Sequence, residues 1–228
     1  MFSVIIPVYN EQDNLLKLID EINHSLTDFS NYEIIFINDA STDNTFNVLN
    51  NIKNSKIKIL NNKINSGQSF SIHYGIKSSI FNIIITIDGD GQNDPADIPS
   101  LLRHYLSVEA IKLVGGIRII RKDNLLKIIS SKIANYLRSR VLQDNCADTG
   151  CSLKIFDKQI FLNFPYFDGI HRFLPALFKG YGFKTKFVNV NHRSRKYGLS
   201  KYGTINRLFR GIRDIIKVKK IINKKKIL

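Results

Sequence analysis

The first ninety residues alternate between short apolar runs and amphipathic stretches. Apolar or alternating runs predict four β-strands, at 2–8, 32–37, 56–60 and 83–87. Leucine and isoleucine recur at helical spacing in 11–27, which predicts a helix capped by Asn10. Another helix is expected from Ser66 to about Ser79. Strands that alternate with helices in this way indicate an α/β fold whose parallel sheet is covered by helices on both faces.

The second half of the chain is less regular. Strands are expected at 111–120, after the turn 148–151, and at 183–190, and a long helix is expected at 125–142. From residue 205 onwards, apolar residues form one helical stripe, and lysine and arginine occupy most of the remaining positions. No repeat and no linker rich in Pro, Gly or Ser divides the chain. We therefore expect one domain, 1–203, followed by a basic amphipathic helix or tail, 204–228.

Polar clusters follow three of the predicted strands. They are Tyr9-Asn10-Glu11, Asn38-Asp39 and the run from Asp88 to Asp94. In parallel α/β sheets the ligand lies outside the carboxyl ends of the strands, so these clusters are expected to meet at one edge. This coincidence of three loops predicts a binding site there.

The segment 83–95, IIITIDGDGQNDP, runs from a buried strand into an acidic loop. Asp88 and Asp90 supply two hard oxygen ligands suited to one divalent cation, and Gln92 adds a neutral third oxygen. Gly89 and Gly91 allow the backbone to turn sharply and a ligand to come close. The competing interpretation is a pair of Asp-Gly turns that merely end the strand.

Two further features of this loop bear on its interpretation. An EF-hand calcium loop is excluded because Asn93 and Pro99 stand where its glycine and its last glutamate should be. Asp94 precedes Pro95, which is a common arrangement of a helix N-cap followed by proline at the first helical position. Asp94 is therefore explained as well by capping as by metal binding.

Charge narrows the class of partner. The 228 residues carry 34 Lys and Arg against 19 Asp and Glu, a formal net charge of +15, which indicates an anionic partner. Nucleic acid, a phosphorylated substrate and an anionic membrane surface all fit that charge. The acidic loops at the strand ends would repel a nucleic-acid backbone, so no nucleic-acid partner is expected.

Two basic regions have both a functional and a structural interpretation. The loop 192–203 holds Arg193, Arg195, Lys196 and Lys201 among glycines, which suits phosphate oxygens, although a solvated basic loop fits as well. The C-terminal helix either packs on the core through its stripe or lies on anionic lipid, where each basic residue adds roughly 1 kcal/mol.

The remaining features set expectations about compartment. Cys146 and Cys151 are expected to be small buried thiols rather than a disulfide framework or a zinc site. No signal peptide and no apolar run near the roughly 20 residues of a membrane span is found. We expect a cytoplasmic protein that lies on the membrane surface if it meets one. His73 is expected to be packed, and His171-Arg172 to be a surface polar pair.

Seven sequence motifs, taken in order along the chain, resemble those of a known protein family. They are VIIPVYNEQDNL, INDASTDNT, NSGQS, IDGDGQNDP, DTGCSLK, HRFLPAL and RKYGLSKYG. Together they resemble the family 2 glycosyltransferases of the dolichol-phosphate mannosyltransferase type, from residue 4 to about 214. The resemblance implies a GT-A, Rossmann-like fold, a nucleotide-sugar donor (GDP-mannose or a UDP-sugar) and Mg²⁺ or Mn²⁺ as cofactor.

The resemblance also implies roles for single residues. Positions that hold the nucleotide are matched by Pro7, Tyr9, Glu11 and Asp39. The metal-binding D-x-D-x-Q is matched by Asp88, Asp90 and Gln92. Positions near the phosphates of donor or acceptor are matched by Arg118, Arg195, Ser200 and Lys201. Asn38 departs from the pattern, because many members have an aspartate there, but an amide can still hydrogen-bond a base.

The function expected from this resemblance is a metal-dependent, inverting transfer of one sugar to a polyprenyl or dolichyl phosphate at the cytoplasmic membrane face. The chemistry is expected to rest on Asp90, Arg118, Arg195 and Lys201. An alternative is transfer to a glycan or protein hydroxyl, which requires a general base, and Asp148 is the first candidate. A basic nucleic-acid-binding protein is the alternative from another class.

Overall fold

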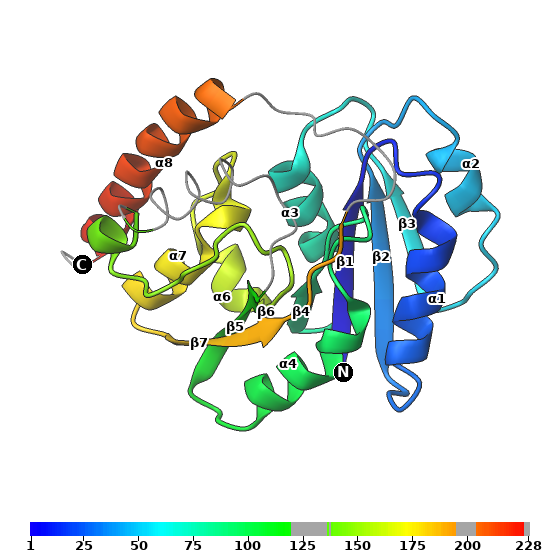
Figure 1. Cartoon of the computed structure of the whole chain (residues 1–228), viewed down its shortest axis with the longest axis horizontal. Helices are drawn as coiled ribbons and strands as arrows, with labels where there is room; N and C mark the ends of the chain where they lie inside the picture. The colour runs from blue at the N-terminus through cyan, green and yellow to red at the C-terminus, as the bar shows by residue number, and fades with distance from the viewer. Residues whose placement is uncertain (120–135, 137, 195–203, 226–228) are drawn as a thin grey trace.

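The computed structural model describes residues 1–119, 136, 138–194 and 204–225, with the side chains of 204–210 left out. Within this part of the chain, seven strands form one sheet in the order β3-β2-β1-β4-β6-β5-β7 (Figure 1). The strands are β1 (Phe2–Val8), β2 (Tyr32–Asn38), β3 (Ile57–Asn61), β4 (Ile83–Thr86), β5 (Ile111–Arg118), β6 (Lys154–Asp157) and β7 (Lys184–Val190).

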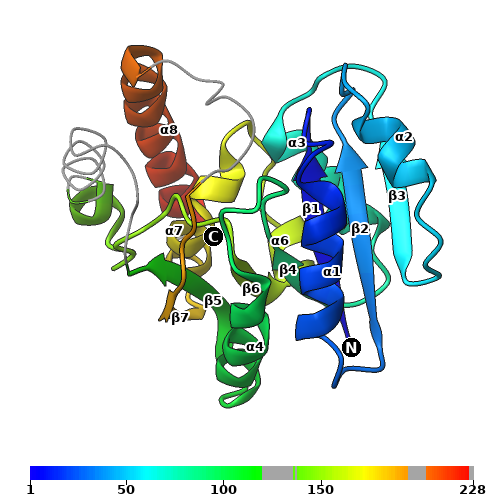
Figure 2. The same ribbon diagram turned by 45° about the vertical axis from the view of Figure 1, so that its right-hand side comes forward.

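Helices cover both faces of the sheet (Figure 2). One apolar cluster joins the sheet to α1 (Leu15–Ser25), α2 (Thr45–Asn50) and α4 (Ile98–Leu106). The other cluster joins it to α3 (Gln68–Ser78), α6 (Lys158–Leu162), α7 (Leu174–Gly180) and α8 (Thr204–Lys225). Because both faces are covered, central strands such as β2, which is buried throughout, consist of nearly continuous apolar residues.

The strand directions bring the predicted site together. β1 runs parallel to β2 and β4, and β2 runs parallel to β3, so all four end at the same edge. β6 is antiparallel to both β4 and β5, which makes β5 parallel to β4. The edge where β4 and β5 end is therefore also the edge where β6 begins. The expected α/β fold with a mostly parallel sheet is confirmed, with β6 as the antiparallel member.

Most predicted elements lie within a few residues of the observed ones, and one helix start was wrong. The first helix begins at Leu15 rather than Glu11, and Asn10 has a left-handed backbone (φ 55°) instead of a cap conformation. Its side-chain oxygen accepts from the Thr42 backbone amide at 2.8 Å, so Asn10 joins two loops. Of the long helix expected at 125–142, the described residues 136 and 138–142 are helical.

Other local predictions are confirmed. Asp94 caps the short 3₁₀ turn Pro95–Asp97, since its Oδ1 accepts from the backbone amide of Ala96 at 3.1 Å. His73 is packed against the rings of Phe161 and Tyr166. Both cysteines are buried free thiols, and burial raises the pKa of Cys151 to about 11.

The apolar stripe of α8 divides between core and surface. Val218 and Ile222 are buried, and Ile222 lies so close to Gly180 of α7 that a Cβ there would be 2.6 Å from it. Ile212 and Ile216 are about half exposed (51% and 52%) instead of facing the core with them. Part of the expected stripe therefore packs on the core, and part of it lies at the surface. Among the described residues, no helix has the length and apolarity that a membrane crossing requires.

Candidate active site

The loops after β1 and β2 are hydrogen-bonded to each other. The Glu11 backbone amide donates to the Thr45 hydroxyl at 2.9 Å, and the Asn10 amide donates to the Ser41 hydroxyl at 3.0 Å. The Glu11 carboxylate is buried and accepts from the Asn14 side chain at 2.7 Å. These contacts hold the predicted nucleotide residues Tyr9 and Glu11 beside the end of β2.

Asp39, directly after β2, fixes the start of α3. Its two carboxylate oxygens accept from the backbone amides of Ser66 and Gly67, both at 2.8 Å, and from the Asn62 side chain at 2.6 Å. An aspartate at this position could cap α2, the helix that follows it in sequence. It holds instead the turn before α3, two elements further on, a contact that the sequence does not reveal.

Asn38 is likewise engaged within the protein. Its side-chain amide donates to the Asn61 oxygen at 3.1 Å, and its own oxygen accepts from the Ser41 backbone amide at 3.1 Å. The departure from aspartate at this position therefore suits a neutral network between the ends of β2 and β3.

The acidic loop follows β4 and packs directly against β1. A Cβ on Gly89 would lie 2.5 Å from Val8 Cγ1, so only glycine allows this approach. Gly91 has φ +70°, a conformation that also favours glycine. Asp90 is buried, and its Oδ1 accepts from the Gln92 backbone amide at 3.1 Å. The two glycines thus hold the three predicted metal ligands at the carboxyl end of β1.

Asp88 is the carboxylate of this loop whose ionised form is disfavoured. Burial, reinforced by the nearby carboxylate of Asp90, raises the pKa of Asp88 to about 6. The Ser152 hydroxyl and the charges of Lys154 and Arg118 act in the opposite direction. Gln68, the first residue of α3, donates from its amide to Asp88 Oδ1 at 2.7 Å.

Two cations stand at the same edge of the sheet, at the end of β5 and the start of β6. Arg118 forms a two-armed ion pair with Asp148, with Nε–Oδ2 and Nη2–Oδ1 distances of 2.7 Å each. Lys154 is buried, and its ammonium donates to the backbone carbonyls of Cys151 and Thr149. The site therefore combines a pair of carboxylates with fixed positive charge, which suits a diphosphate bound together with a cation.

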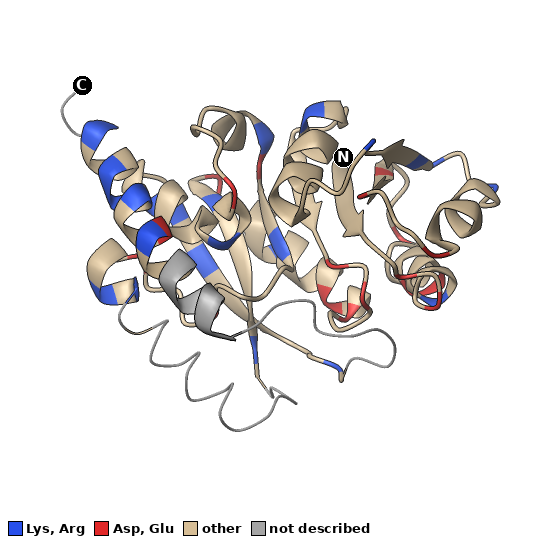
Figure 3. Cartoon of the chain, turned by 90° about the horizontal axis from the view of Figure 1, so that it is seen from above, with Lys and Arg blue, Asp and Glu red and all other residues tan. Residues whose placement is uncertain are grey.

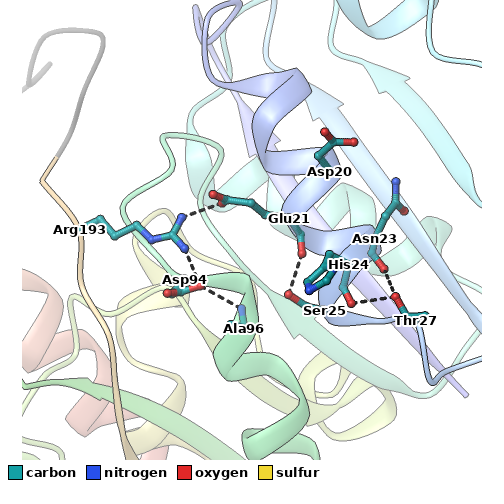
Figure 4. Close-up of a pocket in the computed structure, with 9 residues that line it drawn as sticks. All are labelled: Asp20, Glu21, Asn23, His24, Ser25, Thr27, Asp94, Ala96 and Arg193. Carbon is teal, nitrogen blue, oxygen red and sulfur yellow. Dashed lines mark hydrogen bonds and ion pairs between the residues drawn. The ribbon is translucent and has the colours of Figure 1, made fainter.

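The segment after β7 is attached to the acidic loop. The Arg193 backbone amide donates to the Gln92 carbonyl at 2.9 Å, and Asn93 forms an antiparallel bridge with His192. The Arg193 guanidinium reaches Glu21 of α1 and Asp94, both at 2.7 Å (Figure 4). The sequence left Arg193 open between a phosphate contact and a solvated basic loop; in the structure its guanidinium lies between these two carboxylates and joins α1 to the acidic loop.

An open cavity of about 640 Å³ lies beside this ion-pair cluster. Figure 4 shows its lining, which comes mainly from α1 together with Asp94, Ala96 and Arg193. The lining includes none of the predicted nucleotide or metal residues. The strand-end edge, rather than this cavity, is therefore the candidate site.

His171 contacts the start of α3, which the sequence analysis did not predict. It lies in the 3₁₀ turn Ile170–Arg172, where a surface pair was expected. Its Nδ1 is 2.7 Å from the Ser69 hydroxyl of α3, and Arg172 pairs with the buried Asp214 of α8 at 2.9 Å. The motif HRFLPAL contains both residues, but nothing in its pattern indicates partners about 40 and 100 residues away.

The other predicted site residues fall into two groups. Arg195, Ser200 and Lys201 lie outside the described residues. Pro7 is the last residue but one of β1, in register with Ile37 of β2 and beside the interlocked loops. The remaining predicted residues, from Tyr9 to Arg118, are brought to one edge of the sheet.

The residues at this edge fit a divalent cation. Two carboxylates that lie close enough to raise one pKa gain from a bound cation, and carboxylate and amide oxygens are ligands that Mg²⁺ and Mn²⁺ accept. No cluster of three or more His, Cys, Asp or Glu is found in the described part of the chain. A metal here would therefore depend on Asp88, Asp90 and Gln92, completed by ligand or water oxygens.

The fold is of the GT-A type. Solved structures of glucosyl-3-phosphoglycerate synthase from Mycobacterium tuberculosis superpose with TM-scores of 0.72, covering 96% of this chain and 77–78% of that one at 18% identity. One of those structures contains Mn²⁺, UDP-glucose and glycerol 3-phosphate, and another contains Mg²⁺ and UDP. At this identity the likeness establishes the fold alone.

The chain belongs to glycosyl transferase family 2, whose model matches residues 3–163. The dodecaprenyl-phosphate galacturonate synthase of Rhizobium johnstonii is 34% identical over 223 residues, 95% of this chain. The undecaprenyl-phosphate 4-deoxy-4-formamido-L-arabinose transferase of Yersinia pestis is 33% identical over 94% of this chain. The chain spans 65% and 66% of the length of these two relatives. The family resemblance drawn from the motifs is confirmed.

Proposed function

We propose that this protein transfers one sugar from a UDP- or GDP-linked donor to a polyprenyl phosphate, with Mg²⁺ or Mn²⁺ as cofactor. The observation that carries the proposal is the position of the Asp88–Asp90 pair, between the nucleotide-type loops of β1 and β2 and the cations of β5 and β6. The names of the two relatives, both polyprenyl-phosphate sugar transferases, support the acceptor class.

In this proposal each group has one task. Asp88, Asp90 and Gln92 hold the cation, which when bound stabilises negative charge on the departing diphosphate. Tyr9, Glu11 and the Asp39 network shape the nucleotide side of the site. Arg118, oriented by Asp148, directs fixed positive charge at a phosphate. Arg195, Ser200 and Lys201 are proposed to contact the phosphate of donor or acceptor.

The acceptor needs little activation. A lipid phosphate is already anionic, so its oxygen attacks the anomeric carbon without a strong general base, from the face opposite the diphosphate, and the product is inverted. Transfer to a glycan or protein hydroxyl would require a base. Asp148 was the candidate, but both of its oxygens bond Arg118, which gives that alternative less support.

The proposal includes a position on the membrane surface, at the cytoplasmic face. On α8 the apolar residues Ile212 and Ile216 are about half exposed, and lysine and arginine positions recur along the same helix (Figure 3). Such a helix suits an anionic lipid surface, because the apolar side chains enter the boundary and the basic ones meet headgroups. This surface would bring the acceptor phosphate to the protein.

The donor is tested by thermal unfolding with UDP, UDP-glucose, GDP and GDP-mannose, each with and without MnCl₂. We expect one nucleotide series to raise the unfolding temperature only when metal is present. In Asp90→Asn that increase should disappear, while Asp20→Asn, which changes an exposed acid on α1, should behave as wild type. A chain that no nucleotide stabilises, even with metal, would refute the transferase proposal.

The acceptor is tested with a radiolabelled sugar nucleotide and undecaprenyl phosphate. Label is expected in the organic phase, and label that stays in an aqueous glycan would support the hydroxyl-acceptor alternative.

The membrane position is tested on α8. Lys217, Lys220 and Lys224 are changed together to Glu, and sedimentation of the protein with phosphatidylglycerol vesicles should fall. The control makes the same charge change at Lys53, Lys63 and Arg103, and equal binding by both variants would refute the role of α8.

A further inference from the structure

The start of α3 makes three successive contacts with the site. The backbone amides of Ser66 and Gly67 bind Asp39, the Gln68 side chain binds Asp88, and the Ser69 hydroxyl binds His171. The first two contacts lead to the nucleotide loop and to the metal loop. The third leads to a residue that has no role in the proposed function so far.

The hydrogen bonds around Ser69 determine where the proton of His171 lies. The Gly169 backbone amide donates to the Ser69 oxygen at 2.7 Å. Among the described residues, His171 Nδ1 at 2.7 Å is the one acceptor that the single hydroxyl hydrogen of Ser69 reaches, so Nδ1 is assigned as the acceptor of this bond. A neutral imidazole with an accepting Nδ1 carries its hydrogen on Nε2. The ring therefore presents a fixed N–H donor.

The surroundings keep this ring uncharged. Burial, followed by the charges of Arg172 and Lys154, lowers the pKa of His171 to about 3. The same Lys154 charge acts on the pKa of Asp88, which indicates that His171 and the metal loop border a common region. Among the described residues, none accepts a hydrogen bond from Nε2. The donor is thus available to a ligand.

We propose that His171 Nε2–H binds a hydroxyl oxygen of the transferred sugar. The inference rests on the proposed function, because the order of the α3 contacts matches the order of a nucleotide-sugar. Asp39 lies on the nucleotide side, Asp88 on the diphosphate side, and His171 comes next, where the sugar follows. An uncharged N–H donor suits an uncharged hydroxyl, whereas the diphosphate is served by the cation and by Arg118. Ser69 is the positioning residue that fixes the tautomer.

The test compares the affinity for a nucleotide with that for its sugar conjugate. Calorimetric titrations in MnCl₂ use UDP against UDP-galacturonic acid, and GDP against GDP-mannose. In His171→Phe the nucleotide alone should bind within twofold of wild type, and the sugar conjugate about tenfold more weakly, the scale of one hydrogen bond. Ser69→Ala should weaken the sugar conjugate less, again without affecting the nucleotide.

The control is His73→Phe, the same substitution at a histidine of α3 that packs on Phe161 and Tyr166. It should leave both affinities unchanged. If His171→Phe weakens nucleotide and conjugate equally, or neither, the sugar contact is refuted while the proposed function stands. If wild type and His73→Phe bind no nucleotide with metal present, the proposed function fails first.

Discussion

The Arg118 guanidinium and the Asp148 carboxylate meet through two parallel hydrogen bonds of 2.7 Å, with both side chains largely buried. The Arg118 backbone amide adds a third contact to Asp148 at 3.2 Å. A Cβ on Gly150 would lie 2.9 Å from Arg118 Nη2, so the turn after Asp148 leaves room for the guanidinium alone. This pair fixes a charge at the end of β5 whose orientation does not depend on substrate.

Loss of the Asp148 charge should therefore destabilise the fold. In Asp148→Asn the buried guanidinium loses its counter-ion, and we expect the free energy of unfolding to fall by about 3 kcal/mol. Urea denaturation measures this change. The control is Lys17→Met, which removes an exposed pair with Glu21 and should cost less than about 0.5 kcal/mol. Equal effects of the two substitutions would contradict a structural role for the Arg118 pair.

Asp88→Asn should separate stability from metal binding. Burial and the Asp90 charge disfavour an ionised Asp88, so the neutral amide should raise the unfolding temperature of the metal-free protein by about 3 °C. The same variant should lose the stabilisation that MnCl₂ with nucleotide gives to wild type. Differential scanning calorimetry with and without metal distinguishes the two effects. A metal-free variant less stable than wild type would show that Asp88 supports the fold.

Gly89→Ala should disturb the contact between the acidic loop and β1. The new methyl would lie 2.5 Å from Val8 Cγ1 and 3.3 Å from the Pro7 carbonyl, so the loop must shift. We expect a loss of about 1–3 kcal/mol of stability together with weaker Mn²⁺ binding, read by electron paramagnetic resonance. Gly211→Ala is the matched control. A Cβ there meets nothing within 4 Å on α8, and stability should rise by about 0.5–1 kcal/mol.

The pH dependence of stability should carry a contribution from His171. Its pKa is about 3 in the folded protein, against 6.5 as the ordinary value. Above about pH 6.5 the ring is neutral in both states. As the pH falls below that value, the imidazole is protonated in the unfolded chain but stays neutral in the folded protein. The free energy of unfolding therefore falls.

Urea denaturation between about pH 7.5 and pH 4.5 measures this contribution. His171→Phe should lose less stability than wild type over that range, because it has no imidazole to protonate. His24→Phe, at an exposed position in α1, should follow wild type. An unchanged pH dependence in His171→Phe would mean that the ring is not held neutral by its surroundings.

The sequence by itself determined the alternation of strands and helices and the acidic loop after β4. These features depend on neighbours in the chain: apolar runs that are buried on both faces, helical spacing in α1, and glycines beside aspartates. The cap at Asp94 is local in the same sense, because its partner Ala96 is two residues away. For these positions residue type and spacing carry the necessary information.

The tertiary structure decided which polar groups became partners. Asp39 and Ser66, Ser69 and His171, Arg118 and Asp148, and Glu21 and Arg193 are 27 to 172 positions apart. Each of these polar side chains had several possible partners of suitable chemistry along the chain. The sheet order β3-β2-β1-β4-β6-β5-β7 determined which partner lies within reach. For that reason the sequence does not reveal that His171 contacts Ser69, or that Arg193 pairs with Glu21 and Asp94. The sequence specified the chemical groups of the site, and the packing of the strands determined which of them meet.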